Sequence, residues 1–224
     1  PFAASSPPDL DLEPKGATFG AMALLDWIAP ESGLRIEGEG VYLRPPRWSD
    51  FPTWRHLRQQ SREFLQPWEP TWPSDDLSRA AFRRRLAAYA RDREIGAAYP
   101  FFVFRSSDGA LTGGITLSNV RRGVAQMGSV GYWCGRPFTR GGHTLAAVRA
   151  MTHFAFRSLA LHRLEAACIP DNEPSRRLLN KAGFTEEGLA KAYLKINGVW
   201  RDHVLFGLVS PLRAHDRPDE VVSV

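Results

Sequence analysis

Seven stretches of the chain are rich in β-forming residues, and several of them alternate apolar with polar positions, a pattern typical of strands that bury one face. The first stretch ends at Pro45–Pro46, because proline cannot donate a hydrogen bond to a neighbouring strand. The last two are joined by Asn197–Gly198, which is typical of a type I′ hairpin turn. The predicted strands span residues 34–44, 99–105, 111–120, 124–134, 161–169, 184–196 and 199–209.

Between these strands, apolar residues recur at helical spacing. Ser49–Asp50 can cap a helix that runs to about Arg62, and Ser74–Asp76 can begin a second helix. A long helix is predicted over 142–159 and a short one over 172–182. The order of the elements predicts a mixed α/β (α+β) fold with about four helices and a mostly antiparallel sheet.

We expect one domain over residues 34–212, between an N-terminal tail over 1–33 and a C-terminal tail over 213–224. Residues 1–21 are rich in proline, alanine, serine and glycine and show no sustained period, which predicts a flexible segment. Met22 opens a stretch with more apolar residues. We therefore hold as a hypothesis that the natural chain begins there.

The composition, 43% hydrophobic and 24% charged, is that of a soluble globular protein. No apolar run approaches the roughly 18 residues of a membrane span, and no secretory signal is visible, so we expect no membrane contact and a cytoplasmic location. Cys134 and Cys168 do not form a zinc-binding pair, and the histidines show no metal-binding spacing. We therefore predict no metal site and two reduced thiols.

The chain carries a net charge of +5, and 25 of its 29 basic residues are arginine. Arginine suits the recognition of phosphates and carboxylates. The charge therefore fits an acidic cofactor, a ribosome or another nucleic-acid-rich partner, and it does not choose among them. A nucleic-acid-binding module has only this charge in its favour, and we expect no direct binding to DNA.

Two predicted helix N-termini are candidate binding sites for a ligand. Gly141–Gly142 lets the backbone approach a phosphate at the start of the long helix, and Arg140 adds a cationic donor. An ordinary strand-to-helix turn would explain the same glycines, and the Gly-Lys-Ser/Thr of a P-loop is missing. The second helix start, at Asn172 and Ser175, follows a predicted strand directly. Open α/β sheets bind ligands at such strand ends, so the two together indicate a phosphorylated cofactor.

These segments and several others resemble the GNAT-fold N-acetyltransferases, and within that superfamily the RimJ/RimL group, which acetylates protein N-termini. The loop with Pro67–Pro70 and the hairpin from Asn197 to Val204 are most similar to the RimJ branch. The residues that carry the resemblance are Phe64–Pro70, Ser118–Val120, Gly131–Tyr132, Arg140–Thr144, Leu161–Arg163, Asp171–Ser175, Lys181–Phe184 and Asn197–Val204.

The resemblance implies a sheet that splays between its fourth and fifth strands, with acetyl-coenzyme A bound in the opening. The pantetheine arm would pair with the backbone of Trp133, Cys134 and Gly135, and an N–H of this stretch would bind the oxyanion. Asn172 would bond the pantetheine chain. The pyrophosphate would meet the backbone of the turn that comprises Arg140, Gly141, Gly142, His143 and Thr144.

The chain departs from the family in two places. Thr139 and Thr144 stand where the phosphate-binding turn usually has other residues, although the central Gly142 is kept. Ser129 stands where many members have a glutamate that acts as general base. A lysine amine, with a pKa of about 10.4, needs about 4–5 kcal/mol to be neutral at pH 7, whereas an α-amino group near 7.7–8 needs only about 1.4 kcal/mol. The missing base therefore favours an α-amino acceptor.

The expected mechanism is direct attack by the amine in a ternary complex, with Ser175 protonating the leaving thiolate. Glu69 is our candidate for a water-relayed base or an anchor of the amine. Simple helix capping by Ser175 and a surface-loop role for Glu69 remain alternatives. The peptide groove is predicted to be lined by Trp68, Glu69, Asn119, Tyr193, Trp200 and Asp202, although core packing would explain the tryptophans equally well.

The predicted acceptor is a protein or peptide N-terminus, such as that of a ribosomal protein. Two other functions remain open: acetylation of a small amine, polyamine or antibiotic, and non-catalytic acyl-CoA binding by a regulator. The oligomeric state is predicted to be a monomer or a homodimer.

Overall fold

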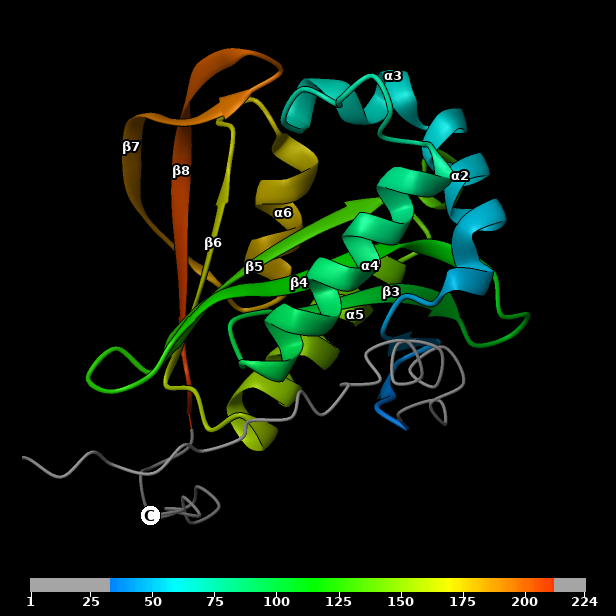
Figure 1. Cartoon of the computed structure of the whole chain (residues 1–224). Helices are drawn as coiled ribbons and strands as arrows, with labels where there is room; N and C mark the ends of the chain where they lie inside the picture. The colour runs from blue at the N-terminus through cyan, green and yellow to red at the C-terminus, as the bar shows by residue number, and fades with distance from the viewer. Residues whose placement is uncertain (1–32, 212–224) are drawn as a thin grey trace, which may run out of the picture. The chain divides into compact units, whose positions relative to one another are not determined.

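The computed structural model describes residues 33–211 (Figure 1). The predicted tails over 1–33 and 213–224, apart from Gly33, and the proposed start at Met22 lie outside the described residues. The strands are β1 (Ile36–Gly38), β2 (Val41–Arg44), β3 (Tyr99–Arg105), β4 (Leu111–Arg121), β5 (Met127–Cys134), β6 (Arg163–Cys168), β7 (Thr185–Ile196) and β8 (Val199–Val209).

The helices are α2 (Phe51–Gln60), α3 (Arg62–Leu65), α4 (Arg79–Glu94), α5 (His143–His153) and α6 (Glu173–Lys181). Short 3₁₀ turns are η1 (Trp48–Asp50), η2 (Gln66–Trp68) and η3 (Arg136–Phe138), and the π-helical segment η4 (Phe154–Ser158) continues α5. No helix within residues 33–211 is long and apolar enough to cross a membrane.

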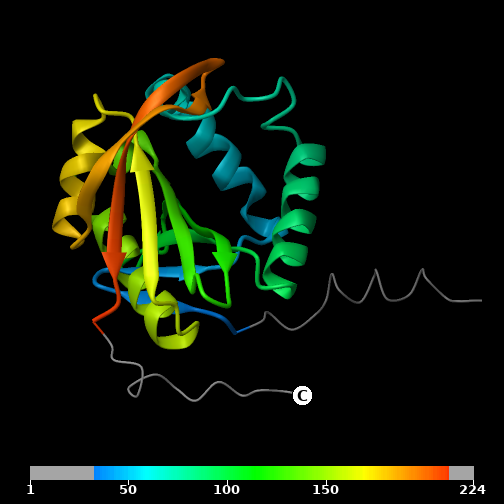
Figure 2. The same cartoon turned by 90° about the vertical axis from the view of Figure 1, so that its left-hand side faces the viewer.

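All eight strands form one sheet in the order β1-β2-β3-β4-β5-β6-β8-β7. Every neighbouring pair is antiparallel except β5 and β6, which are parallel. Helices α2 and α4 lie on one face of the sheet and α5 and α6 on the other (Figure 2). The sheet is thus the middle of three layers, and the predicted mixed α/β fold is confirmed.

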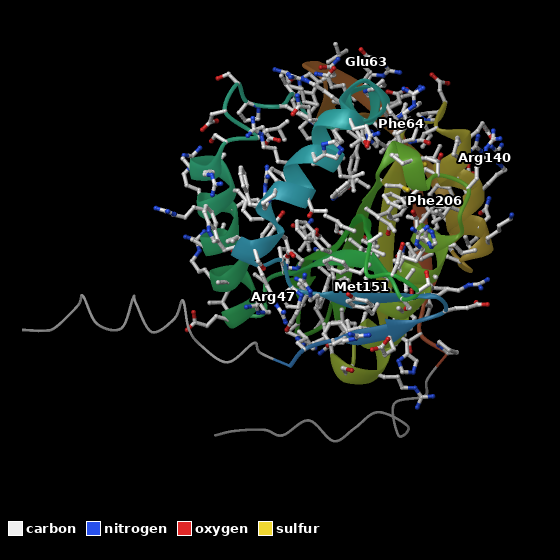
Figure 3. The ribbon with its side chains drawn as sticks, turned by 90° about the vertical axis from the view of Figure 1, so that its right-hand side faces the viewer. Arg47, Glu63, Phe64, Arg140, Met151 and Phe206 are labelled. Atoms are coloured by element: carbon white, nitrogen blue, oxygen red, sulfur yellow. The ribbon has the colours of Figure 1, made fainter. Side chains whose placement is uncertain are left out.

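Each face of the sheet has its own apolar cluster. The larger one joins α5 and α6 to the sheet and includes Met151 and Phe206, which lie inside the molecule in Figure 3. The smaller one joins α2 and α4 to the other face through aromatic rings, with Phe82 of α4 at its centre, 4.8 Å from the ring of Trp54. The candidate site lies between these two clusters, at the end of the sheet where β5 and β6 separate.

Three predicted elements differ from the structure. The first predicted strand, 34–44, is a hairpin, because Gly40 turns the chain with a φ of +70° while the alternation of apolar residues continues on both sides. The second helix begins at Arg79 and not at Ser74–Asp76, since the Ser78 hydroxyl caps it by accepting the N–H of Ala81. Part of the predicted tryptophan-rich loop is helical, as α3, which makes five helices within the described residues.

The separation of β5 from β6 is the feature that positions the site. The two strands pair only from Met127–Ser129 to Arg163–Glu165, whereas β5 stays paired with β4 as far as Cys134. Beyond Ser129 the strands diverge, as Figure 1 shows. The predicted splay between 124–134 and 161–169 is therefore confirmed, and we call this opening the fork.

Gly114 allows the indole of Trp133 to lie against β4 at the open end of the fork. The two residues are paired across the strands. A Cβ atom at position 114 would lie 2.4 Å from the Trp133 Nε1 atom, far closer than van der Waals contact allows. Gly131, on the same strand as Trp133, has open space where its Cβ would be.

We expect Gly114→Ala to lower the free energy of unfolding by about 1–3 kcal/mol, because the added methyl group displaces the indole from a packed position. Gly131→Ala is the matched control and should change it by less than about 0.5 kcal/mol. Urea unfolding of the two variants and the parent protein measures both values. Equal stability of all three proteins would contradict the close contact.

Candidate active site at the fork

The turn before α5 is shaped to hold an anion. Arg140 and Gly142 both have left-handed backbones, with φ of +63° and +79°, and Gly142 is the N-cap of α5. Successive amides in such a turn point to one side, and the helix start adds its own unpaired N–H groups and positive dipole end. Arg140 and both glycines are exposed, and Figure 3 shows Arg140 at the edge of the molecule.

The end of β5 lies beside this turn. Cys134 is half-buried, and burial raises the pKa of its thiol, while an interaction with Thr144 of α5 acts in the opposite direction. The Gly135 N–H already donates to the carbonyl of Thr112, at 2.8 Å. The ring of His143 meets Phe138 edge to face. The raised pKa favours the protonated thiol at neutral pH.

The start of α6 is joined to β5 across the fork. Asn172 caps the helix, and its Oδ1 atom accepts the Ser175 N–H at 3.2 Å. The Ser175 hydroxyl lies 2.8 Å from the hydroxyl of Tyr132 on β5. Burial raises the pKa of the Tyr132 phenol well above its ordinary value, so this group keeps its proton at physiological pH. A protonated pair of hydroxyls therefore spans the opening.

The Tyr132 hydroxyl was not among the predicted site residues. The sequence carried a weak signal for it, because Tyr132 and Val130 alternate along a strand and so share a face. The contact between Ser175 and the Tyr132 hydroxyl depends on how α6 packs after β6. No local sequence pattern predicts that packing. The same serine also interacts with the buried thiol of Cys168.

Glu69 is held in a buried ion pair. Both of its oxygens accept hydrogen bonds from Arg58, at 2.7 and 2.6 Å, and one also accepts the indole N–H of Trp72 at 2.7 Å. The Arg58 guanidinium lies over the ring of Trp72 at 4.1 Å and faces that of Trp133 at 5.0 Å. Arg58 is buried, and its Nε atom has no partner among the described residues. This arrangement anchors the loop after α3 to β5.

The hairpin of β7 and β8 closes the other side of the fork. Its turn residue Asn197 donates a backbone N–H to the carbonyl of Glu69 at 2.9 Å, which links the hairpin to the loop. Asn197 and Gly198 both have positive φ, as the predicted type I′ turn requires. Tyr193 and Trp200 are 46% and 61% exposed, so neither is a core residue.

Asp202, a predicted groove residue, is bound within the β7–β8 hairpin. Its carboxylate accepts the backbone N–H of Ala192 and pairs with Lys191 at 2.8 Å, while Arg201 lies 3.7 Å from Asp171. The hydrogen bond from Lys191 lowers the pKa of Asp202. The carboxylate is half-exposed and stabilises a bulge in β7, where Ala192 has a positive φ.

Two other predicted groove residues have different positions. Trp68 is half-buried at the end of η2, beside Glu69. Asn119 is exposed in a bulge of β4, five residues beyond Gly114 and at the paired end of the fork. At about 3.4 Å per residue, that places it roughly 17 Å from the level of Trp133. Asn119 therefore lies near Ser129, at the paired end of the fork, and not at the level of Trp133.

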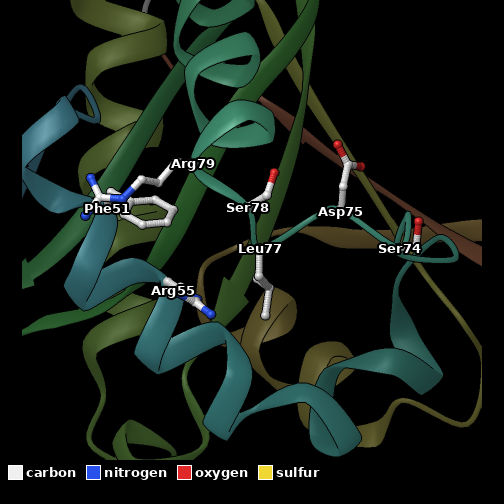
Figure 4. A pocket seen from close by; sticks show the side chains of 7 residues that line it. All are labelled: Phe51, Arg55, Ser74, Asp75, Leu77, Ser78 and Arg79. Carbon is white, nitrogen blue, oxygen red and sulfur yellow. The ribbon is translucent and has the colours of Figure 1, made fainter.

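Two open depressions lie outside the fork. One is formed by α2 and the segment before α4, with Phe51 and Leu77 at its base (Figure 4). Its only carboxylate, Asp75, already binds Arg84, and it contains none of the fork residues. The other lies against the turn at Gly141–Gly142. Within residues 33–211, no group of three or more histidine, cysteine or carboxylate side chains could hold a metal ion.

The comparisons with known proteins agree with this geometry. Residues 41–185 match the model of a family described as acetyltransferase (GNAT) domain. The chain is 34% identical over 176 residues to the probable N-acetyltransferase YjcK of Bacillus subtilis, which covers 79% of this chain and 97% of YjcK. It is also 34% identical over 152 residues to the ribosomal protein uS5-alanine N-acetyltransferase of Escherichia coli. That alignment covers 68% of this chain and 78% of the Escherichia coli enzyme.

Among solved structures, RimJ of Mycobacterium smegmatis, in complex with CoA-disulfide, superposes with a TM-score of 0.74. The two chains are 32% identical, and the superposition covers 79% of this chain and 86% of RimJ.

We expect Glu69→Gln to lower the free energy of unfolding by about 2–3 kcal/mol, because it leaves the buried guanidinium of Arg58 without a charged partner. Glu63→Gln, at an exposed carboxylate of α3 close by, is the matched control and should stay within about 0.5 kcal/mol of the parent protein. Denaturant unfolding at neutral pH compares the three proteins. If Glu69→Gln behaves like the control, the ion pair does not anchor the loop.

Proposed function

Because the chain belongs to the GNAT acetyltransferase family and is an acetyl-CoA-dependent N-acetyltransferase of the RimJ/RimL-like group, we propose that its acceptor is the α-amino group of a protein N-terminus. The observation that carries this proposal is Ser129, on the acceptor side of the fork where a carboxylate base would stand. An α-amino group needs much less help to lose its proton than a lysine does. The relative that acts on an alanine of ribosomal protein uS5 supports the same acceptor class.

We propose that the turn at Arg140–Thr144 binds the pyrophosphate of the cosubstrate. Its left-handed residues and the start of α5 supply N–H donors without any protein acceptor between them. The Asn172 side chain uses its oxygen to cap α6, which leaves its amide NH₂ for the pantetheine chain. In the Trp133–Cys134 stretch, the N–H that faces the open edge of β5 is that of Cys134, and we propose that it supplies a further donor.

In the proposed mechanism, the neutral amine attacks the thioester carbonyl directly. An N–H of Trp133–Cys134 receives the developing oxyanion, which a fixed amide stabilises better than water does. Ser175 donates its hydroxyl proton to the leaving thiolate, and Tyr132, at 2.8 Å, holds that hydroxyl in position. Glu69 becomes a weaker candidate for the base, because both of its oxygens already accept hydrogen bonds. We propose instead that it positions the loop beside the acceptor.

The acceptor groove is proposed to lie on the face of the sheet that carries α2, between the loop at Trp68–Glu69 and the β7–β8 hairpin. Tyr193, whose ring lies beside that of His203, is proposed to stack against the first residues of a peptide, and the exposed ring of Trp200 is proposed to contribute from the end of the hairpin. Asp202 is occupied by Lys191 and shapes the hairpin, so it is not proposed to contact the amine. A ribosomal protein remains our proposed partner.

Acetylation of short peptides that differ at their first residue tests the acceptor class. We expect transfer to free N-termini, with kcat/KM at least about tenfold higher than for a lysine peptide with a blocked N-terminus, because the lysine amine is about 2–3 pKa units more basic. The readout is release of free thiol with mass spectrometry of the product. Preference for the blocked lysine peptide, or for small polyamines, would contradict the proposal.

Ser175→Ala should lower kcat by about 10²-fold while acetyl-CoA affinity changes less than about threefold, since general acid catalysis contributes about 10²–10⁴. Tyr132→Phe should lower kcat about tenfold by freeing the serine hydroxyl. Thr152→Ala and Tyr89→Phe are the matched controls, because the Thr152 hydroxyl bonds within α5, to the carbonyl of Val148, and Tyr89 lies on α4. Steady-state kinetics and calorimetric binding separate the two effects. An unchanged kcat in Ser175→Ala rules out the acid role.

A further inference from the structure

No carboxylate of the fork is free to take the proton from the attacking amine, and the chain must provide that acceptor elsewhere. We propose that His203 of β8 is the general base of the acetyl transfer, with Nε2 as the atom that receives the proton. This inference rests on the proposed function, since it concerns the same site and the same α-amino acceptor.

His203 faces the acceptor side of the sheet. Along β8, Val204 and Phe206 point into the cluster under α5 and α6. Because side chains alternate along a strand, His203, next to Val204, projects to the opposite face. On β5, Trp133 projects to that opposite face too, where it packs with the α2 and α4 cluster. His203 and Trp133 therefore share the face on which the amine must approach.

The histidine also lies at the level of the open end. Val204 pairs with Cys168, the last residue of β6, so His203 comes just beyond the end of that strand. This is the end at which β5 and β6 have parted and from which the chain leads into α6 with Ser175. In strand register, the imidazole therefore lies at the level of Trp133 on β5, with the end of β6 between the two strands.

The hydrogen bond that His203 makes selects its tautomer. Its Nδ1 atom lies 3.0 Å from the carbonyl oxygen of Arg201, and because a carbonyl can only accept, Nδ1 carries the hydrogen. The lone pair of the neutral ring is then on Nε2. Within residues 33–211, Nε2 has no hydrogen-bond partner. The ring of Tyr193 meets the imidazole edge to face at 5.7 Å and limits its rotation.

The other ionisable groups on this face are already paired. On the hairpin, Asp202 binds Lys191, and Arg201 faces Asp171. On β6, Glu165, whose backbone pairs with Ser129, is bound to Arg163 at 3.2 Å. On the facing loop, Glu69 is bound to Arg58, and Tyr193 of β7 is a phenol. Within residues 33–211, the proton acceptors near the groove that no cation binds are therefore the imidazole, which is buried, and the carboxylate of Glu63 on α3, which is exposed to solvent.

His203, Ser175 and water account for every proton that moves in the reaction. Nε2 takes one proton from the α-ammonium group, directly or through one water, and the neutral nitrogen then forms the C–N bond. As the C–S bond breaks, the sulfur takes the hydroxyl proton of Ser175, and the second proton of the nitrogen returns to the serine through water. The imidazolium releases its proton to solvent before the next turnover.

H203N is the informative variant, because the asparagine amide can still donate to the Arg201 carbonyl where Nδ1 did, yet it offers no basic nitrogen. With an α-amino peptide as acceptor, we expect kcat/KM to fall about 10²-fold at pH 7. The loss should shrink to within about threefold at pH 9.5, because an α-amino group with a pKa of about 8 is then neutral without help. Acetyl-CoA affinity and the circular dichroism spectrum should match those of the parent protein.

E165Q is the control, since Glu165 is the carboxylate nearest to Ser129 in register, and we expect it to keep near-parent activity at both pH values. A loss in H203N that is equal at pH 7 and pH 9.5 would assign the histidine a structural role and overturn the proposal. A pH-dependent loss in E165Q in place of H203N would transfer the role to that carboxylate. If H203N does not fold, H203Q measured in the same way decides between these outcomes. Failure of the parent protein to acetylate any peptide N-terminus would contradict the proposed function instead.

Discussion

The parting of β5 from β6 after three paired residues is the constraint on which the rest of this structure depends. If β6 stayed paired with β5, it would use the amides of Val130, Tyr132 and Cys134, which face away from β4. Because β6 turns away, these amides face an opening in which a cosubstrate can hydrogen-bond to them. The groups proposed to act in acetyl transfer come from β5 and α6 beside this opening and from β8, the strand on the far side of β6.

The opening is held by contacts from both faces of the sheet. On one face, the hydroxyls of Tyr132 and Ser175 connect β5 to the start of α6 across the gap. On the other, Arg58 connects the loop at Glu69 to the ring of Trp133, and the β7–β8 hairpin is bonded to the same loop. These contacts hold β5 and β6 at a fixed distance where the two strands no longer pair. Direct transfer between two bound substrates requires such a fixed geometry.

The sequence predicted those features that depend on short-range patterns. Asn197–Gly198 identified a hairpin, and the cap at Asn172 identified the start of α6, because both use only neighbouring backbone atoms. The prediction for residues 34–44 was wrong about the turn, since Gly40 reverses the chain without interrupting the alternation. The level of the candidate groove residue Asn119 along the sheet could not be predicted, because strand register, and not residue type, decides it.

The sequence by itself determined the order of the elements, the glycine turn before α5 and, through resemblance, the family and its cosubstrate. Only the tertiary structure decided which polar side chains are free to act. From the sequence, Glu69 and Asp202 are both plausible acids or bases. In the structure, Glu69 is bound to Arg58 and Asp202 to Lys191, each eleven residues away in the sequence. His203 became a candidate only when strand register placed it beside the opening with one nitrogen unpaired. Chemical availability depends on partners that folding brings together, and local sequence does not contain them.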